Sequence, residues 1–450
     1  MSELRTIARH AGTVLVGQLA TMGFGVADTM IAGRYDTQAL AALSVGSAIY
    51  VSVFVALVGG VQALLPIWAE LRGAGGGPAV GRSVRQSLYL GVSASIVGMA
   101  ILFMPGFVLS AARIPPALEG EVRQYLQVVA LALPAALFFR GYSTLNQALG
   151  KPALVTWLQS LSLAVKVPLS IWLTFGGFGL PALGLAGCAW GTVIVNYLLV
   201  VLAVWTLRTQ SLYEPYGIWR RMEKPDPRAL RGFARLGVPT ALAVLVEVTS
   251  FTLMALFIAR LGTQAAASHQ VAANLTGVLY MMPLSLGLAT SSRVSWWLGA
   301  GDPKQARHAA RLGYKLSLAF AGTSALVLLV AHQPIARLYA GDNPAVVAGA
   351  GSLLLWVALY HFADAQQAVG VFLLRSYGVA TRPLVLYCVL LWGVGLGGGY
   401  TLAYVGIGPV APLRAPSAFW SAGAIALVCT ALAFMVLLWR ESRRPRAPSA

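Results

Sequence analysis

Residues 208–235 read RTQSLYEPYGIWRRMEKPDPRALRGFAR, and this is the longest polar connection in a chain that is otherwise mostly apolar. The stretch is rich in Arg and in Pro, which lacks a backbone N–H and interrupts regular helices. Long apolar runs lie on both sides of it. We therefore expect a linker that divides the chain into two halves.

The apolar runs predict an all-α polytopic membrane protein. The 450-residue chain is 58% hydrophobic and 10% charged, whereas a soluble domain carries roughly 25% charged residues. Runs of about 20 apolar residues can cross the hydrocarbon core of a bilayer. We expect twelve such spans, at 12–33, 40–67, 86–110, 124–145, 153–176, 184–207, 235–260, 265–292, 312–331, 346–373, 383–405 and 418–439. The first run is longer than the core of a signal peptide, and we expect it to be a retained helix.

The positions of the basic residues predict the orientation. The net charge is +18, and most of the 32 Lys and Arg residues flank loops on one side of the twelve predicted spans. By the positive-inside rule this side is cytoplasmic, so both termini are expected in the cytoplasm. We interpret the basic excess as contact with an anionic cytoplasmic leaflet and expect no nucleic acid partner.

The two halves of the chain resemble each other. At a shift of 226 residues, DTQALAA at 36–42 aligns with GTQAAAS at 262–268, and the GAG at 73–75 aligns with that at 299–301. Chance similarity of Ala- and Gly-rich helices is the alternative. Two six-helix bundles related by a pseudo-twofold axis along the membrane normal are typical of alternating-access carriers, with the substrate cavity between the bundles. The expected division is an N-lobe at 1–207 with helices 1–6, a cytoplasmic linker at 208–234, a C-lobe at 235–440 with helices 7–12, and a basic tail at 441–450.

Four charged residues lie in the middle of predicted spans, namely Asp28, Lys166, Glu247 and Asp364. A charge at a helix centre costs roughly 2.5–3.5 kcal/mol on insertion scales, so such residues are candidates for function. Each lies on a polar stripe at helical spacing, which indicates a side facing the bundle interior. A carboxylate that can exchange a proton for another ion suits an ion-coupled carrier. Alternatively, these are core polar groups with satisfied partners, and Lys166 pins a bundle or extends toward an interface.

Several motifs are absent, and their absence narrows the function. The GAGGG at 73–77 lacks the GK[ST] that completes a phosphate-binding loop. We also find no HExxH and no nucleophile elbow, so we expect a transporter without catalytic residues or cofactor, driven by an ion gradient. His361 and Asp364 could face one metal ion, but a third ligand is not evident.

Longer stretches resemble one family, the multidrug and toxic compound extrusion (MATE) transporters, in its bacterial NorM-like branch. In the first half the similar stretch is MGFGVADTMIAGRYDTQALAALSVG. In the second half AASHQVAANL and FADAQQAVGVFLLRSYGVATRP are similar, and the resemblance covers essentially the whole chain. It implies a V-shaped fold of twelve helices and an antiporter that exports organic cations and other xenobiotics in exchange for H⁺ or Na⁺.

The resemblance also implies roles for individual residues. Asp28, Glu247 and Asp364 match the family's coupling carboxylates, and Glu247 and Asp364 are the candidate Na⁺ ligands. We expect Glu247 and Asp364 to lie close together, with His361 and Gln270 nearby. The polar cavity is expected to contain Gln18, Thr21, Ser170, Thr192, Asn196, Gln270, Asn274, Tyr360, His361 and Gln367.

One stretch departs from the family pattern. Where the family shows Asn-x-Pro-Leu-Asn, residues 166–170 read KVPLS, so both amides are missing and one is replaced by a cation. We therefore expect Lys166, rather than sodium, to be the resting partner of Asp28, with the two residues acting as ion-coupling groups. An unpaired buried charge of either sign would be costly, whereas a pair offsets part of each desolvation penalty.

Two other functions remain as alternatives. A lipid-linked precursor flippase of the same superfamily would need a basic cavity, whereas three acids and one base lie within the spans. A channel or a structural membrane protein would need a ring of equivalent residues, and the two halves place their acids differently. We expect a monomer whose partners are small organic cations and the bilayer.

Overall fold

The computed structural model describes residues 2–106, 109, 116–177, 179–340, 343–406, 408–409 and 411–444. Within these ranges the regular structure is helical, apart from an isolated bridge between Gly177 and Leu180. Eleven helices are long and apolar enough to cross a membrane, and the count is twelve if one bent pair forms a single span. The all-α membrane fold is thus confirmed. Parts of the predicted span 86–110 and of the predicted tail 441–450 lie outside the described residues.

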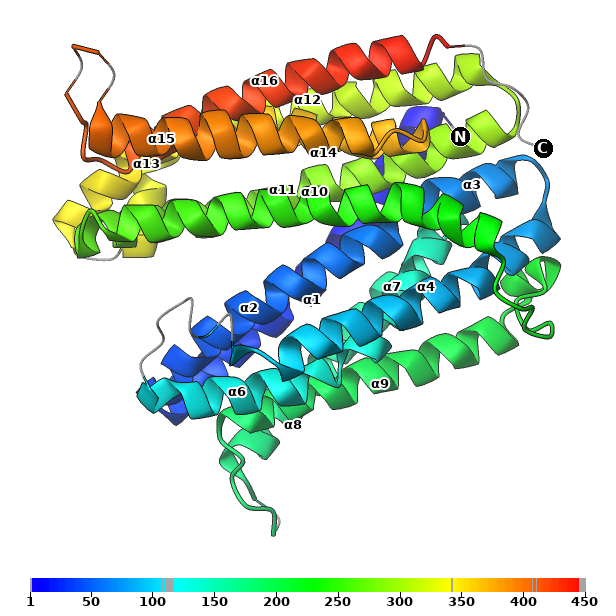
Figure 1. Ribbon diagram of the computed structural model, residues 1–450, viewed down its shortest axis with the longest axis horizontal. Helices are drawn as coiled ribbons and strands as arrows, with labels where there is room; N and C mark the ends of the chain where they lie inside the picture. The colour runs from blue at the N-terminus through cyan, green and yellow to red at the C-terminus, as the bar shows by residue number, and fades with distance from the viewer. Residues whose placement is uncertain are drawn as a thin grey trace. The chain divides into compact units, whose positions relative to one another are not determined.

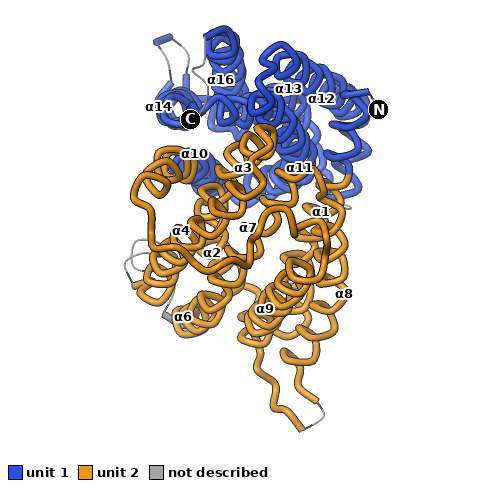
Figure 2. Tube along the Cα trace, turned by 90° about the vertical axis from the view of Figure 1, so that its right-hand side faces the viewer, with its two compact units in different colours: residues 1–12, 242–450 blue, residues 13–241 orange. Residues whose placement is uncertain are grey.

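The described chain forms two compact units (Figure 2). Unit 2 contains residues 13–241, and unit 1 contains residues 1–12 and 242–450. We expected the two lobes to be divided at the linker. The boundaries of the compact units instead fall between residues 12 and 13 and between residues 241 and 242, each inside a long helix. Residues 1–12 therefore group with the second half of the sequence, and the linker groups with the first half.

Unit 2 holds six of the twelve possible spans, and its helices are labelled in Figure 1. Its elements are α1 (Glu3–Tyr35, from residue 13), α2 (Thr37–Gln62), α3 (Leu65–Gly73), α4 (Gly77–Phe103), α6 (Pro116–Ala130), α7 (Leu133–Ala148), α8 (Ala153–Phe175), α9 (Leu185–Thr209) and η1 (Ser211–Tyr216). The predicted spans 40–67 and 124–145 are each broken into two helices, and α6 and α7 meet at 46°. Pro66 and Pro134 open the second helix of each pair, because proline fits the first turn of a helix but not its interior.

Unit 1 holds the other six possible spans, and its helices are labelled in Figure 1. Its elements are α10 (Pro227–Ala259, from residue 242), α11 (Thr263–Gly299), α12 (Pro303–Ala340), α13 (Pro344–Ser376), α14 (Thr381–Tyr387), η2 (Cys388–Gly397), α15 (Gly398–Tyr400), η3 (Thr401–Val405) and α16 (Ser417–Glu441). The span 381–405 contains two π-helical segments, η2 and η3. Five of the seven residues at 393–399 are glycines, which permit such irregular winding. The centre of the unit is α13, most of whose second half is buried.

The linker is fastened to α4 by side chains. Arg85 donates to both carboxylate oxygens of Glu223 and to the carbonyl of Gly217. Gln86 bonds the backbone on both sides of Pro225, and the hydroxyl of Tyr89 donates to the carbonyl of Glu223. The connection that divides the sequence is therefore an ordered part of unit 2.

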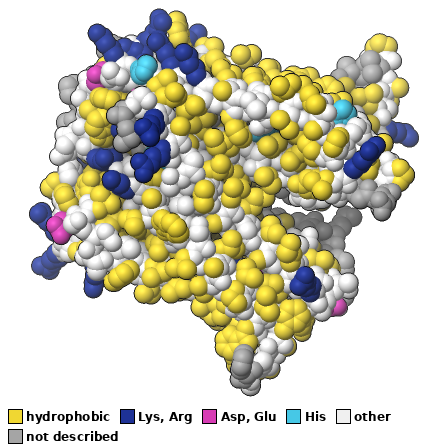
Figure 3. Space-filling model, turned by 180° about the vertical axis from the view of Figure 1, so that it is seen from behind, with side chains coloured by type: hydrophobic (Ala, Val, Ile, Leu, Met, Phe, Trp, Pro, Cys, Tyr) yellow, Lys and Arg dark blue, Asp and Glu magenta, His cyan; other side chains and the backbone are white. Residues whose placement is uncertain are grey.

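The beginning of α1 is attached to α11 inside unit 1. Arg293 donates to both carboxylate oxygens of Glu3 at 2.7 and 2.8 Å, and the indole of Trp297 donates to the same carboxylate at 3.2 Å. The Arg293 guanidinium also lies 4.6 Å from the ring centre of Trp296. Charged side chains gather in clusters, and the surface between them is broadly hydrophobic (Figure 3). This distribution suits helices that cross a bilayer.

Candidate ion-coupling sites

The first candidate site is a buried ion pair in unit 2. The ammonium of Lys166 on α8 lies 2.5 Å from a carboxylate oxygen of Asp28 on α1. The Lys166 side chain is 0% exposed and that of Asp28 is 10% exposed. The ammonium also lies 5.5 Å from the ring centre of Phe24, one turn earlier on α1. The contact expected between Lys166 and Asp28 is present, and it brings together the two charges of the first half that were singled out as mid-span.

Small and polar residues allow α1 and α8 to approach closely. A side chain at Gly17 would collide with the amide of Gln159, and one at Gly23 would collide with Leu163. The amide of Gln159 donates to the hydroxyl of Thr21 at 3.0 Å. Close approach through small residues is the usual way in which membrane helices associate. These contacts fix the position of α8 against α1 two turns before Asp28.

Other predicted polar residues of unit 2 lie at different distances from the ion pair. Thr192 on α9 lies close enough to Asp28 to interact with its carboxylate, and its hydroxyl donates to the carbonyl of Cys188 at 3.2 Å. Asn196 donates to the carbonyl of Thr192 at 2.8 Å, one turn farther along α9. Ser170 is fully buried one turn beyond Lys166, and a side chain at Gly191 would collide with it. Gln18 is ten residues from Asp28, about 15 Å along the helix, so it does not reach the pair.

The second candidate site, in unit 1, is built around one glutamine. The amide nitrogen of Gln367 donates to Asp364 at 2.8 Å and to Glu247 at 3.2 Å. Its amide oxygen accepts a hydrogen bond from the hydroxyl of Tyr387 on α14. Gln367 is fully buried, with 0% exposure, and Asp364 is 5% exposed. The expected proximity of Glu247 and Asp364 is therefore present, because one amide group bridges them.

The π-helical segment η2 holds α10 on both sides of Glu247. The indole of Trp392 donates to the carbonyl of Val246 at 3.1 Å. The hydroxyl of Ser250 donates to the carbonyl of Leu391 at 3.4 Å. The irregular winding of η2 thus coincides with the contacts that fix the position of the carboxylate, and π-helical turns are frequent at functional sites.

Two residues expected near the carboxylates make contacts with other side chains. His361 is 0% exposed, its ring packs against Phe320 on α12, and neither ring nitrogen has a hydrogen-bond partner among the described residues. Gln270 is exposed and donates to Asn274 at 3.3 Å on the same helix. The expected proximity of His361 and Gln270 to the carboxylate pair stays a prediction, because the contacts described for both side chains are to other neighbours.

Tyrosines surround the carboxylates of unit 1. Tyr360, which was expected here, and Tyr280 both lie close enough to Glu247 and Asp364 to interact electrostatically. Tyr280 and the hydrogen-bonding Tyr387 were missed from the sequence. Spacing along one helix relates residues of that helix only, and neither tyrosine lies on a helix stripe that already contained a charged residue.

The two sites differ in charge. In unit 2 the carboxylate and the ammonium compensate each other. In unit 1 neither Glu247 nor Asp364 forms an ion pair with any residue that the structure describes, although both accept from Gln367 and the buried Arg375 acts electrostatically on Glu247 at longer range. Two carboxylates without a paired base can attract a proton, a metal cation or an organic cation. Within the described ranges, no group of three or more His, Cys, Asp or Glu side chains could hold a metal ion.

Comparison with known proteins identifies relatives over the whole chain. The MatE family model matches residues 14–172 and 239–401. The probable multidrug resistance protein NorM of Aromatoleum aromaticum is 37% identical over 441 residues, which cover 97% of this chain and 94% of that protein. The multidrug resistance protein PmpM of Pseudomonas aeruginosa is 32% identical, with coverage of 98% and 92%.

Solved structures share the fold. A multidrug resistance MATE family transporter in an outward-facing conformation has a TM-score of 0.87 at 14% identity, covering 98% of this chain and 96% of that one. The eukaryotic MATE transporter AtDTX14 has a TM-score of 0.85 at 20% identity, covering 98% and 97%. At these identities the likeness concerns the fold.

Proposed function

The chain belongs to the MatE family, in its bacterial NorM-like branch, and on that premise we propose that it is a secondary active multidrug efflux antiporter. It exports organic cations and other xenobiotics in exchange for H⁺ or Na⁺, by alternating access. Relatives named as multidrug resistance proteins support export of small molecules. The protein acts as a transporter rather than an enzyme and needs no cofactor.

The observation that carries the proposal is the carboxylate pair of unit 1. Glu247 and Asp364 share the amide of Gln367 inside a helix bundle, and neither forms an ion pair with a described residue, since Arg375 acts on Glu247 only at longer range. Two unpaired charges at membrane depth are expensive. A cation that binds there removes part of this cost, and H⁺, Na⁺ and an organic cation would compete for the same negative charge. Such competition couples the entry of an ion to the release of a substrate.

The ion pair of unit 2 serves as a proton-driven switch. Lys166 already supplies the positive charge beside Asp28 that a bound metal cation would supply, so a proton is the ion that fits this site. When Asp28 is protonated, the ammonium loses its counter-charge and the contact between α1 and α8 loosens. A pair with two such arrangements biases a conformational equilibrium according to which ion is bound.

The proposed setting is the inner membrane of a bacterium, with both termini cytoplasmic and the protein monomeric. The distribution of Lys and Arg supports this orientation. Single cysteines placed near either terminus, in a variant lacking Cys188, Cys388 and Cys429, should react with a membrane-impermeant maleimide only after the cells are opened. Labelling in intact cells would reverse the assigned orientation.

Transport in proteoliposomes tests the function directly. Purified protein should move ethidium against its gradient when a proton or a sodium gradient is imposed separately, and the two arms identify the coupling ion. Glu247→Gln and Asp364→Asn should each abolish this transport. Glu119→Gln, which alters an exposed carboxylate paired with Arg123, is the matched control and should transport normally. Equal transport by Glu247→Gln and the unaltered protein would overturn the assignment.

A further inference from the structure

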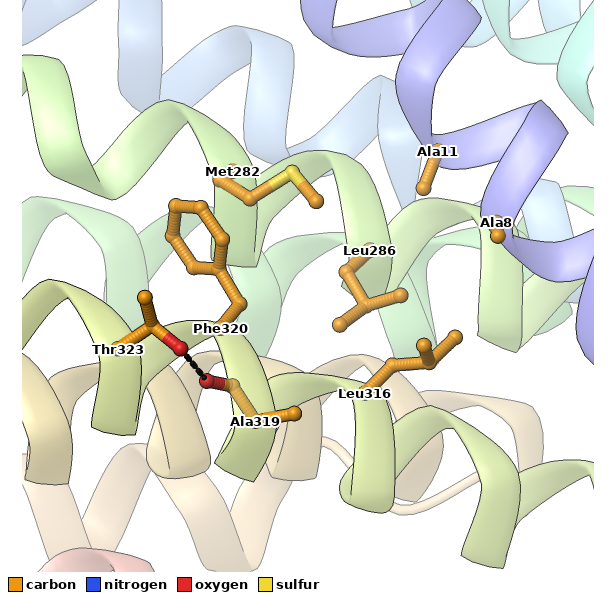
Figure 4. A pocket seen from close by; sticks show the side chains of 8 residues that line it. All are labelled: Ala8, Ala11, Met282, Leu286, Leu316, Ala319, Phe320 and Thr323. Carbon is orange, nitrogen blue, oxygen red and sulfur yellow. Dashed lines mark hydrogen bonds between the residues drawn. The ribbon is translucent and has the colours of Figure 1, made fainter.

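An apolar cavity of about 320 Å³ lies inside unit 1, between α1, α11 and α12. Ala8 and Ala11 of α1 form one wall, and Met282 and Leu286 of α11 with Phe320 of α12 form the others (Figure 4). The volume corresponds to roughly ten water molecules at about 30 Å³ each. It is separate from the carboxylate pair, since none of the residues that line it belongs to that cluster.

The lining offers an occupant almost no polar contact. Thr323 carries the one side-chain hydroxyl, and it already donates to the carbonyl of Ala319 at 2.8 Å, as the dashed line in Figure 4 shows. The remaining side chains are hydrocarbon or thioether. A polar ligand group inside the cavity would lose its hydrogen bonds to water without replacement. The inserted part of an occupant must therefore be a hydrocarbon chain.

Basic side chains lie one helical turn from the cavity on two of its walls. Arg5 precedes Ala8 by three residues on α1, and Lys315 precedes Ala319 by four residues on α12, spacings that place each pair on one helix face. Both basic side chains are exposed, and neither forms an ion pair with a described residue. The carboxylate on the same turn of α1, that of Glu3, is bound by Arg293 and so does not neutralise them.

We infer that this cavity binds an anionic phospholipid, with one acyl chain between α1 and α12 and the phosphate at Arg5 and Lys315. Acyl chains alone cannot make such a site selective, because the lipid around the protein is equally apolar. Selection comes from the headgroup, since basic pockets between membrane helices attract anionic lipids. At about one kcal/mol for each basic residue, each of the two contributes roughly five-fold to the preference over a zwitterionic lipid.

The bound lipid has a defined structural effect. Residues 1–12 belong to unit 1, where Glu3 attaches them to α11. A lipid with its chain against Ala8 and its phosphate at Lys315 joins the same segment to α12. Phosphatidylglycerol should therefore slow hydrogen exchange in the first three turns of α1, whereas phosphatidylcholine should not.

Native mass spectrometry of delipidated protein tests the site. Dioleoylphosphatidylglycerol should be retained as a single adduct roughly 25-fold better than dioleoylphosphatidylcholine, whose chains are identical. Arg5→Gln with Lys315→Gln should abolish this preference, and Arg5→Lys with Lys315→Arg should keep it. Arg337→Gln, an exposed base at the far end of α12, is the matched control and should leave the preference unchanged. Glycerol phosphate, a headgroup without chains, should not bind.

A second pair of variants tests the acyl chain. Ala319→Leu fills part of the cavity and should weaken retention of dioleoylphosphatidylglycerol, whereas Ala100→Leu, at an exposed position of α4, should not. An unchanged lipid preference after removal of both bases would overturn the inference. Equal retention by Ala319→Leu and Ala100→Leu would also overturn it, because the chain would then lie elsewhere. Transport is not measured in these experiments, so their outcome is independent of the proposed function.

Discussion

Replacing Lys166 with methionine should destabilise the protein by about 3–5 kcal/mol. The Lys166 ammonium is fully buried and lies 2.5 Å from the carboxylate of Asp28, which is 10% exposed. Methionine fills a similar volume but carries no charge, so the substitution leaves a buried carboxylate without its partner. Removal of one member of a buried ion pair typically costs this amount, and most of it is the desolvation penalty of the charge that remains.

The double variant Lys166→Met with Asp28→Leu should be more stable than either single variant. With both charges absent, no uncompensated group remains, and replacement of a buried pair by apolar residues is often neutral or even stabilising. The two single effects should therefore be strongly non-additive, as expected of residues in direct contact. Lys151→Met, which removes an exposed lysine, is the matched control and should change the stability by about 0.5 kcal/mol or less.

The assay is equilibrium unfolding in detergent micelles with increasing denaturant, followed by tryptophan fluorescence. If the double variant loses as much stability as the two single variants combined, the residues act independently and the ion pair has no energetic role. Transport adds a functional readout. Lys166→Asn introduces the amide that the family resemblance implies at this position and should increase the dependence on sodium, whereas unchanged ion preference in this variant would refute the proposed switch.

Three further predictions concern other contacts. Gln367→Leu should lower the free energy of unfolding by about 1.5–3 kcal/mol, since two carboxylates lose their hydrogen-bond donor. Gln366→Leu should be neutral or stabilising, because that buried amide has no partner among the described residues. Denaturant unfolding measures the stability of both variants. The Arg85 hydrogen bonds lower the pKa of Glu223 from 4.5 to about 2. The contact between the linker and α4 should therefore be complete above about pH 4.5 and be lost toward pH 2, where pepsin should cleave the linker faster. In Glu223→Gln the linker is already released, so cleavage should not rise over this pH range. Gly187→Ala should cost about 1–3 kcal/mol in the same unfolding assay, because its Cβ would lie 2.6 Å from the backbone of α8.

Hydropathy and charge predict the helices because the bilayer imposes a minimum length on every span. Each of the twelve predicted spans overlaps a described helix or pair of helices. The two breaks at Pro66 and Pro134 were visible in the sequence as prolines, but an apolar window averages over them. The π-helical winding of 388–397 has a weaker signal, since glycines permit it without requiring it.

The candidate sites were predictable to the extent that they consist of charged residues. A mid-span charge is rare enough to be recognised alone, which is how Asp28 and Lys166 were found. The neutral partners lie on other helices, and no spacing along the chain relates Gln367 to Tyr387 across the turn between α13 and α14. For the same reason, the polar stripe on α13 indicated that His361 faces the interior, but it could not predict that Phe320 of α12 packs against the His361 ring.

The different counter-charges of the two sites imply different ion selectivity. With its carboxylate ionised, the pair in unit 2 is neutral, so any added cation leaves it with a net positive charge and is repelled by Lys166. A proton avoids much of this repulsion because it forms a covalent bond to Asp28. The unit 1 cluster carries two negative charges when Glu247 and Asp364 are both ionised, and the single positive charge of Arg375 offsets only part of them, so one added cation reduces the repulsion there. Sodium and organic cations should therefore compete at unit 1, while unit 2 responds to protons only, and a sodium gradient should drive transport even when Asp28 is replaced by asparagine.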